Sequence, residues 1–170
     1  KEVDSIRHNF QNSESVGQDS FILWAKENPN LSLGVVLKAG ALFSGIGGFC
    51  LGFQKYGIKT SWAVEQNYDA VDTYEQNIKG VRLVFDNGIP ADIKNVTVKG
   101  NDLEPVDILH AGFPCQSFSM AGERKGFDDP RGQLFFEIIR LIKEFKDRQP
   151  SVLVLENAPY LRIGNGGSWF

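Results

Sequence analysis

The chain has 170 residues, of which 42% are hydrophobic and 23% charged, and this is the composition of one soluble globular domain. Lys and Arg total 18 against 21 Asp and Glu, and the net charge of −3 argues against a protein that binds nucleic acid by charge alone. Two cysteines exclude a disulfide scaffold, and neither a membrane span nor a signal peptide is visible. We expect a cytoplasmic bacterial protein, or a nuclear one in a eukaryote.

The N-terminal segment differs in character from the rest of the chain. Residues 1–34 are rich in Ser, Asn, Gln and acidic side chains, which predicts a flexible polar arm. A short helix over residues 21–27 is expected, capped by Asp19 or Ser20 and ended by Asn28-Pro29-Asn30. No chemistry is visible in this arm.

From residue 35 onward, apolar segments alternate with amphipathic ones. We expect strands at residues 35–43, 60–64, 82–85, 106–110 and 151–155, and helices at residues 49–56, 68–78 and 133–146. The last strand is apolar throughout, which predicts burial on both faces of a sheet. The alternation predicts an α/β fold with an open, mostly parallel sheet and helices on both faces.

Unusual residues follow four of these strands, at the carboxyl ends where such sheets bind ligands. They are the glycine turn of residues 44–48, Glu65, the segment of residues 112–116 and the pair Glu156-Asn157. A constellation of four such ends carries more weight than any one of them. We therefore expect a binding or catalytic site along this edge.

The glycine turn and Glu65 together indicate a nucleoside cofactor. A dinucleotide-binding turn requires glycine at positions 45, 47 and 50, but position 50 is Cys50, and the third glycine is Gly48. Glu65 follows Gly45 by 20 residues, at the spacing where a carboxylate binds both ribose hydroxyls. An adenosine cofactor such as S-adenosylmethionine fits this pattern better than a dinucleotide does. Without Glu65, a tight strand–helix turn would be the simpler interpretation.

The two cysteines lead to different predictions. Cys50 lies on the apolar face of a helix and is expected in the core. Cys115 follows Gly112 and Pro114 at a strand end, where a nucleophilic thiolate is plausible. Glu156 is its candidate partner, and the alternative for Glu156 is a buried salt bridge. His110 is interpreted as a satisfied strand residue, because two His and two Cys offer no metal-ligand spacing.

These residues resemble the ordered motifs of DNA (cytosine-5)-methyltransferases over residues 38–163. The resemblance covers Glu65, Asp92-Ile93, Glu156-Asn157 and the segments of residues 43–48, 112–119 and 131–136. The Pro-Cys-Gln block, followed by Arg-Gly-x-Leu-Phe-Phe and then Glu-Asn, is highly specific in combination. This sequence departs from the family at Ala41, Ala158 and Gln66, where relatives often carry Asp, Val and an aromatic residue respectively.

The resemblance implies a Rossmann-like fold that binds S-adenosylmethionine and releases S-adenosylhomocysteine. The implied cofactor residues are Phe43, Ser44, Gly45, Ile46, Gly47, Gly48, Glu65, Gln66, Asp92, Ile93, Gly112, Pro114 and Leu134. Within this set, Glu65 would hold the ribose, and Asp92 with Ile93 would bind the adenine edge. No metal is implied.

The resemblance also implies the chemistry. Cys115 would attack C6 of a cytosine taken out of duplex DNA, and Glu156 would hydrogen-bond N3 and the exocyclic amine. A raised pKa would suit a carboxyl group in that role. The loop of residues 117–130 would close over the base. The implied nucleic-acid contacts are Gln116, Ser119, Arg131 and Asn157, whereas Arg124-Lys125 fits a solvated surface pair equally well.

On this interpretation, residues 35–170 form the cofactor-binding and catalytic part of a methyltransferase, truncated before its target-recognition domain and inactive alone. The expected partners are double-stranded DNA, in restriction–modification or epigenetic methylation, and either a complementing subunit or a C-terminal remainder. The alternatives are a transfer-RNA cytosine-5 methyltransferase and a non-catalytic S-adenosylmethionine-binding subunit of a split enzyme. A nicotinamide oxidoreductase is the weakest option, because Cys50 interrupts its glycine pattern.

Overall fold

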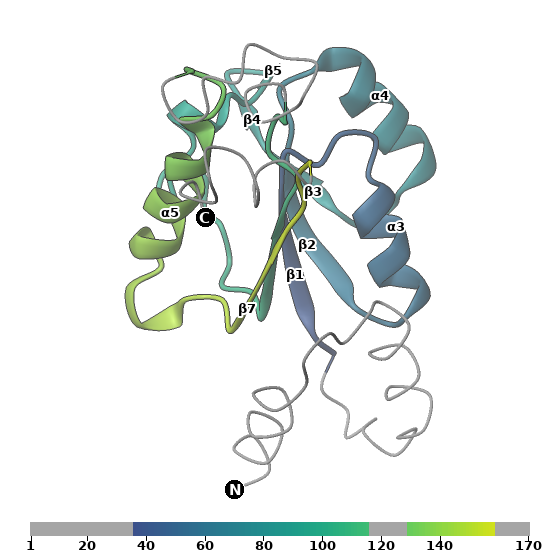
Figure 1. Cartoon of the computed structure of the whole chain (residues 1–170). Coiled ribbons are helices and arrows are strands. Elements are labelled where there is room, and N and C mark those ends of the chain that lie inside the picture. Colours follow the sequence, from purple (N-terminus) through teal and green to yellow (C-terminus); the bar gives the residue numbers. More distant parts are fainter. Residues whose placement is uncertain (1–35, 116–128, 159–170) are drawn as a thin grey trace, which may run out of the picture. The chain divides into compact units, whose positions relative to one another are not determined.

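The fold is that of a computed structural model, which describes residues 36–115 and 129–158 (Figure 1). The predicted polar arm with its short helix, the side chains of Gln116 and Ser119, and most of the predicted closing loop lie outside these residues. Four strands are followed by the unusual residues noted above. The carboxyl ends of all four lie within the described residues.

Five parallel strands form the central sheet, in the order β3-β2-β1-β6-β7. They are β3 (Arg82–Leu83), β2 (Lys59–Val64), β1 (Lys38–Leu42), β6 (Ile108–Ala111) and β7 (Val152–Leu155). The predicted open parallel sheet is confirmed. The first strand is shorter than expected, because Val36 and Leu37 lie exposed before it begins.

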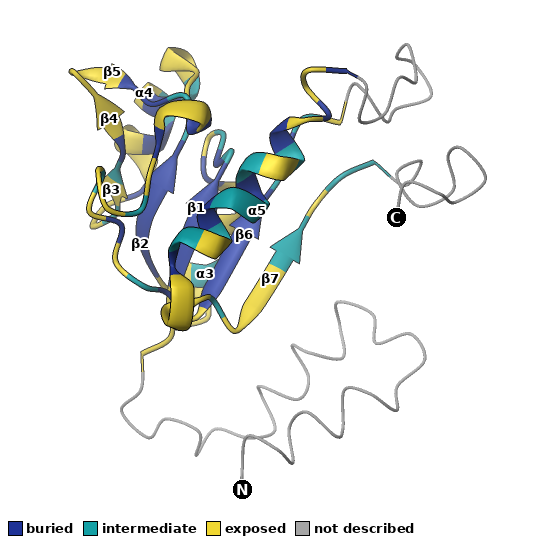
Figure 2. Ribbon diagram, turned by 90° about the vertical axis from the view of Figure 1, so that its left-hand side faces the viewer, coloured by how far each residue is buried: buried dark blue, intermediate teal, exposed yellow. Residues whose placement is uncertain are grey.

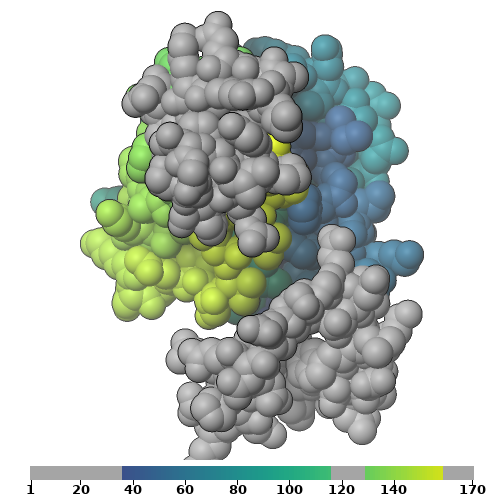
Figure 3. Space-filling view, in the orientation of Figure 1, coloured from purple at the N-terminus to yellow at the C-terminus, as the bar shows by residue number. Residues whose placement is uncertain are grey.

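Helices cover both faces of the sheet. The helices α3 (Gly48–Lys55) and α4 (Tyr68–Asn77) lie on one face, and α5 (Leu134–Glu144) lies on the other (Figure 1). In the space-filling view, the blue part of the chain that includes α3 and α4 and the yellow-green part that includes α5 form opposite sides of the molecule (Figure 3). The first turn of α4 is capped by Asn67, whose side chain accepts a hydrogen bond from the Ala70 amide at 2.9 Å. None of the described helices has the length and apolar character needed to cross a membrane.

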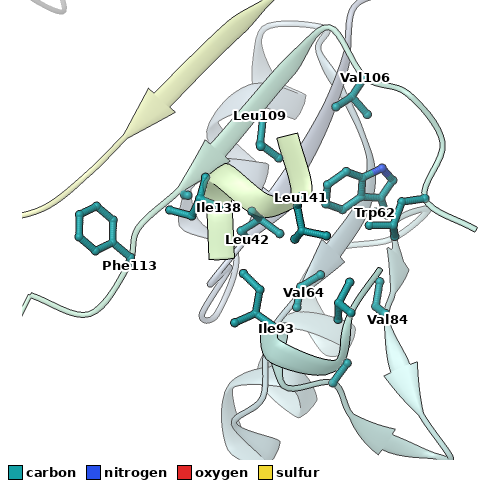
Figure 4. Packing of buried hydrophobic residues seen from close by; sticks show 14 of the residues in the cluster. Leu42, Trp62, Val64, Val84, Ile93, Val106, Leu109, Phe113, Ile138 and Leu141 are labelled. Atoms are coloured by element: carbon teal, nitrogen blue, oxygen red, sulfur yellow. The ribbon is translucent and has the colours of Figure 1, made fainter. Parts of the chain in front are cut away.

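The main core lies between α5 and the sheet. Ile138 and Leu141 pack on Leu42, Trp62 and Leu109 of the strands, and all five side chains are almost completely buried (Figure 4). The predicted apolar face of α5 is confirmed, because Leu134, Ile138 and Leu141 recur at helical spacing and are all buried. Each such aliphatic side chain contributes about 1.5–3 kcal/mol through burial.

On the face of the sheet that α3 and α4 cover, the strands contribute small side chains to the core, so these helices can pack close to the sheet. Ala41 and Ala63 of the sheet lie against Cys50 of α3. They also lie against Tyr74 of α4 and against Ile78, which follows the last residue of that helix. Cys50 is 1% exposed, so its predicted place in the core is confirmed.

The last strand, β7, corrects the prediction of burial on both faces. Val152 is 47% and Leu153 40% exposed, and among the described strands β7 is the last in the order of the sheet (Figure 2). The apolar run of residues 152–155 cannot reveal this, because a central strand and a strand at the end of a sheet can have the same apolar sequence.

A small hairpin replaces the end of the predicted third strand. β3 stops at Leu83, and β4 (Phe85–Asp86) then pairs antiparallel with β5 (Ile89–Pro90). Asn87 and Gly88 join them with φ of 50° and 80°, which are the left-handed angles of a two-residue hairpin turn. The Asn-Gly dipeptide was the sequence signal for this turn.

Candidate cofactor and catalytic site

A cleft of about 190 Å³ opens at the carboxyl ends of β1, β2 and β6. Its lining comprises Phe43, Val64, Glu65, Gln66, Ala91, Asp92, Ile93, Gly112, Pro114 and Leu134. All but Val64 and Ala91 were predicted as cofactor residues. The remaining predicted residues, those of the turn at 44–48, do not line the cleft. Val64 and Ala91 are apolar neighbours of predicted residues and carry no signal of their own.

The strand order explains why these distant residues meet. From β1 the chain continues to β2 on one side, whereas β6 lies on the other side of β1. The loops after β1 and β6 therefore diverge, which leaves a crevice at the point where parallel sheets bind their ligands. Phe43 follows β1 and Gly112 follows β6, so they face the cleft from the two sides of this point.

The glycine turn is shaped by backbone angles that few residues adopt. Gly47 has φ of 90°, and a Cβ built there would lie 2.2 Å from Cδ1 of Ile78 and 2.7 Å from the Tyr74 ring, so a larger residue would force these side chains to shift. Phe43 has φ of 53°, which is unfavourable for an aromatic residue by about 1–3 kcal/mol. This unfavourable conformation occurs where Phe43 lines the cleft.

Glu65 joins the loops that follow β1 and β2. Its Oε2 accepts a hydrogen bond from the Gly45 amide at 2.9 Å, and its Oε1 accepts from the amides of Gln66 at 2.9 Å and Asn67 at 2.8 Å. Each carboxylate oxygen has more than one acceptor site, so hydroxyl groups can still bind to it. Glu65 therefore stabilises the turn as well as lining the cleft, a structural role that the sequence did not suggest.

Asp92 and Ile93 form the opposite wall. Asp92 caps the short 3₁₀ helix η2 (Ile93–Asn95), and its Oδ1 accepts a hydrogen bond from the Lys94 amide at 3.0 Å. Ile93 is 4% exposed and presents an apolar side chain beside that carboxylate. An apolar surface next to an acceptor suits a flat heterocycle with an amino group at its edge.

Cys115 and Glu156 both lie at this edge of the sheet. Cys115 is exposed, three residues beyond Gly112. The Glu156 amide donates to the Ala111 carbonyl at 3.1 Å, and a Cβ built on Gly112 would be 3.4 Å from Oε2 of Glu156. The carboxylate therefore lies along the turn that leads to Cys115. Glu156 is itself exposed, so the alternative of a buried salt bridge is wrong.

Two of the predicted nucleic-acid contacts are engaged within the chain. The Asn157 side chain donates to the Phe113 carbonyl at 2.9 Å and accepts from the Ala158 amide at 2.9 Å, which braces the turn before Cys115. Arg131 forms a two-pronged ion pair with Asp129, with Nε–Oδ1 and Nη2–Oδ2 distances of 3.0 and 2.8 Å. The roles of both residues toward nucleic acid stay predictions.

His110 is less well satisfied than predicted. Its Nε2 lies 3.5 Å from the Cys50 sulfur and its ring stacks on Phe49 with centroids 4.9 Å apart, but Nδ1 has no hydrogen-bond partner among the described residues. Burial lowers the pKa of His110 to about 4, so the ring is neutral near pH 7. It lies on the α3 face of the sheet, behind the cleft.

Comparison with known proteins identifies the family of this chain. The chain matches the C-5 cytosine-specific DNA methylase family over residues 37–168. It is 42% identical over 137 residues to the Type II methyltransferase M.Bsp6I of Bacillus sp.. This alignment covers 79% of the present chain and 40% of M.Bsp6I. With the Type II methyltransferase M.HhaI of Haemophilus parahaemolyticus it shares 40% identity over 127 residues, covering 75% of this chain and 35% of the relative.

A solved structure supports the fold independently. The Dnmt2 methyltransferase of S. pombe superposes with a TM-score of 0.57 at 21% identity, over 79% of this chain and 38% of that one. The chain spans well under half the length of each of these three proteins. The family match over most of its residues, together with the identity to M.Bsp6I, is decisive: the chain belongs to the family of C-5 cytosine-specific DNA methylases.

Proposed function

We propose that this chain carries the cofactor-binding and catalytic part of an enzyme that methylates C5 of cytosine in duplex DNA, using S-adenosylmethionine. The observation that carries the proposal is the convergence at one sheet edge of the cleft residues with Cys115 and Glu156. The two relatives compared are named Type II methyltransferases, which supports a role in restriction–modification.

The residues of the cleft fit the cofactor. Glu65 offers acceptors to the ribose hydroxyls, and the apolar side chains of Phe43, Ile93 and Leu134 suit the faces of adenine. Gly48 does not line the cleft, but a Cβ built on it would meet no other part of the described chain within 4 Å, which leaves the backbone of the neighbouring turn open to a ligand. When bound, S-adenosylmethionine supplies a methyl group on a positively charged sulfur.

Cys115 acts on the base in this proposal. Its thiolate adds to C6 of a flipped-out cytosine, and the new S–C6 bond leaves C5 rich in electrons, so that C5 can accept a methyl group. Loss of the proton from C5 then breaks the S–C6 bond and restores both the aromatic ring and the thiolate. Glu156 hydrogen-bonds N3 and the exocyclic amine, which supports the charge that develops on the ring.

Covalent trapping tests the role of Cys115. With S-adenosylmethionine present, C5 is methylated, but a fluorine at C5 cannot then leave as a proton does. Duplex DNA with 5-fluorocytosine at the target should therefore remain covalently attached to the full-length protein. Cys115→Ala should abolish this adduct, because the sulfur that forms the bond is gone. Cys50→Ala is the matched control, since that thiol is 1% exposed and lies behind the sheet. An adduct that survives Cys115→Ala would overturn the proposal.

The substrate class is tested separately. Transfer of a labelled methyl group should occur to duplex DNA and not to transfer RNA of equal concentration. Labelling of the RNA alone would leave the chemistry of Cys115 intact but overturn DNA as the substrate.

A further inference from the structure

The wall formed by Asp92 and Ile93 has little regular structure of its own. The helix η2 has three residues, and its local hydrogen bonds are few. The Asn95 amide donates to the Asp92 carbonyl at 2.9 Å, the Val96 amide to the Ile93 carbonyl at 3.2 Å, and the Lys94 amide to Oδ1 of Asp92 at 3.0 Å. A single short turn leaves its position to its neighbours. The contacts that η2 makes with neighbouring elements therefore determine where Asp92 and Ile93 lie relative to a bound ligand.

Arg140 of α5 reaches this wall from outside the cleft. Its Nη2 donates to the carbonyls of Ile93 at 2.9 Å and Val96 at 2.8 Å. Ile93 itself lines the cleft, whereas Arg140 does not. The guanidinium thus contacts the backbone of a cleft residue without itself lining the cleft.

Two carboxylates hold Arg140 in this position. Glu137 accepts from Nε at 2.7 Å, and Glu144 accepts from Nη1. The second oxygen of Glu144 accepts a hydrogen bond from the Val98 amide at 2.8 Å. Residues 93–98 are therefore held at both ends by one turn of α5, through hydrogen bonds in which one partner is charged.

The same helix also contributes to the cleft directly. Leu134, the first residue of α5, lines it, and Ile138 and Leu141 fasten the helix to the sheet. Because α5 is anchored in this way, the position that Arg140 gives to Ile93 is fixed relative to the strand ends. We propose that Arg140 is a positioning residue that sets the Asp92–Ile93 wall, and with it the recognition of the adenine edge of the cofactor. This rests on the proposed function.

The test compares two ligands by calorimetry, S-adenosylhomocysteine and S-inosylhomocysteine, which carries a carbonyl in place of the adenine amino group. The wild-type protein should bind the adenine compound more tightly, because Asp92 offers an acceptor. Arg140→Met should weaken its binding by about tenfold, comparable to the loss of one charge-assisted hydrogen bond, and should reduce the preference over the inosine compound. Lys143→Met, on the exposed side of the same helix, is the control and should change neither.

A merely structural role would give a different result. It would lower the melting temperature while leaving the ratio of the two dissociation constants at its wild-type value, and that outcome would overturn the inference. Arg140→Lys keeps the charge but cannot reach two carbonyls and two carboxylates at once, so it should show the same reduced ratio if Arg140→Met does not fold. Failure of the wild-type protein to bind either ligand would instead overturn the proposed function.

Discussion

At the scale of single residues, the site depends on side chains that serve the fold as well as the ligand. Glu65 was predicted from its distance to the glycine turn, and it does line the cleft. The structure adds that its two oxygens accept three backbone hydrogen bonds, from the amides of Gly45, Gln66 and Asn67. Sequence spacing indicated the carboxylate but not these amides, because they approach from two separate loops.

Glu65→Gln should therefore affect stability before any cofactor is added. One acceptor oxygen becomes an NH₂ group that faces backbone donors, and leaving such a donor unpaired costs about 1–3 kcal/mol. Denaturant unfolding of the cofactor-free protein should show this loss. Glu75→Gln makes the same chemical change on the exposed side of α4 and should stay within about 0.5 kcal/mol of wild type. Equal stability of the two variants would contradict the dual role of Glu65.

At the scale of elements, the periodicity of α5 predicted its buried face correctly, whereas the apolar run of β7 was misinterpreted. A helix reveals its core side through its 3.6-residue repeat. A strand that is apolar throughout carries no such information, because its burial depends on the next strand in space. The register of the sheet makes this difference measurable, since Leu109 of β6 pairs with Leu153 of β7.

These two leucines should respond differently to truncation. Leu109 is 0% exposed in the main core, so Leu109→Ala should cost about 2–5 kcal/mol through lost burial and a cavity. Leu153 of β7 is 40% exposed, so Leu153→Ala should cost less than about 1.5 kcal/mol. Guanidinium unfolding of both variants provides the comparison. A loss for Leu153→Ala as large as that for Leu109→Ala would show that β7 is buried in solution.

At the scale of the whole molecule, one buried histidine should make global stability depend on pH. The folded pKa of His110 is about 4, below its ordinary value of 6.5, because the ring is buried. The unfolded chain therefore binds this proton more readily, and the stabilisation is complete above pH 6.5. It is lost as the pH falls toward 4, at up to about 1.4 kcal/mol per pH unit and by about 3 kcal/mol in all.

The comparison of wild type with His110→Asn isolates this effect. Unfolding free energies of both proteins should be measured from pH 7.5 to 4. The difference between the two curves should shrink as the pH falls, because only the wild-type protein loses the contribution of His110. Other titrating groups contribute equally to both curves and cancel in the difference. Parallel curves over that range would show that His110 does not carry the pH dependence.

Much of the site was predictable because its residues have a local signature. A carboxylate after an apolar strand, a glycine turn and a proline before a cysteine are visible in the chain itself, and parallel topology then brings strand ends together. The Asn87-Gly88 turn was equally local and was overlooked. Arg140, in contrast, looked like any charged residue on the polar face of a helix. Its significance depends on the carbonyls of Ile93 and Val96, 47 and 44 residues away.

Periodicity and side-chain chemistry are properties of short segments, so the alternation of strands and helices, the apolar face of α5 and the residue types at the strand ends could be predicted from the sequence. Packing of distant segments was needed to show that β7 lies at the end of the described strand order, that Glu65 also accepts backbone hydrogen bonds, and that α5 supports the wall of the cleft. These features arise where segments distant in sequence meet, and the hydrogen bonds and burial formed there depend on the packing of the whole chain.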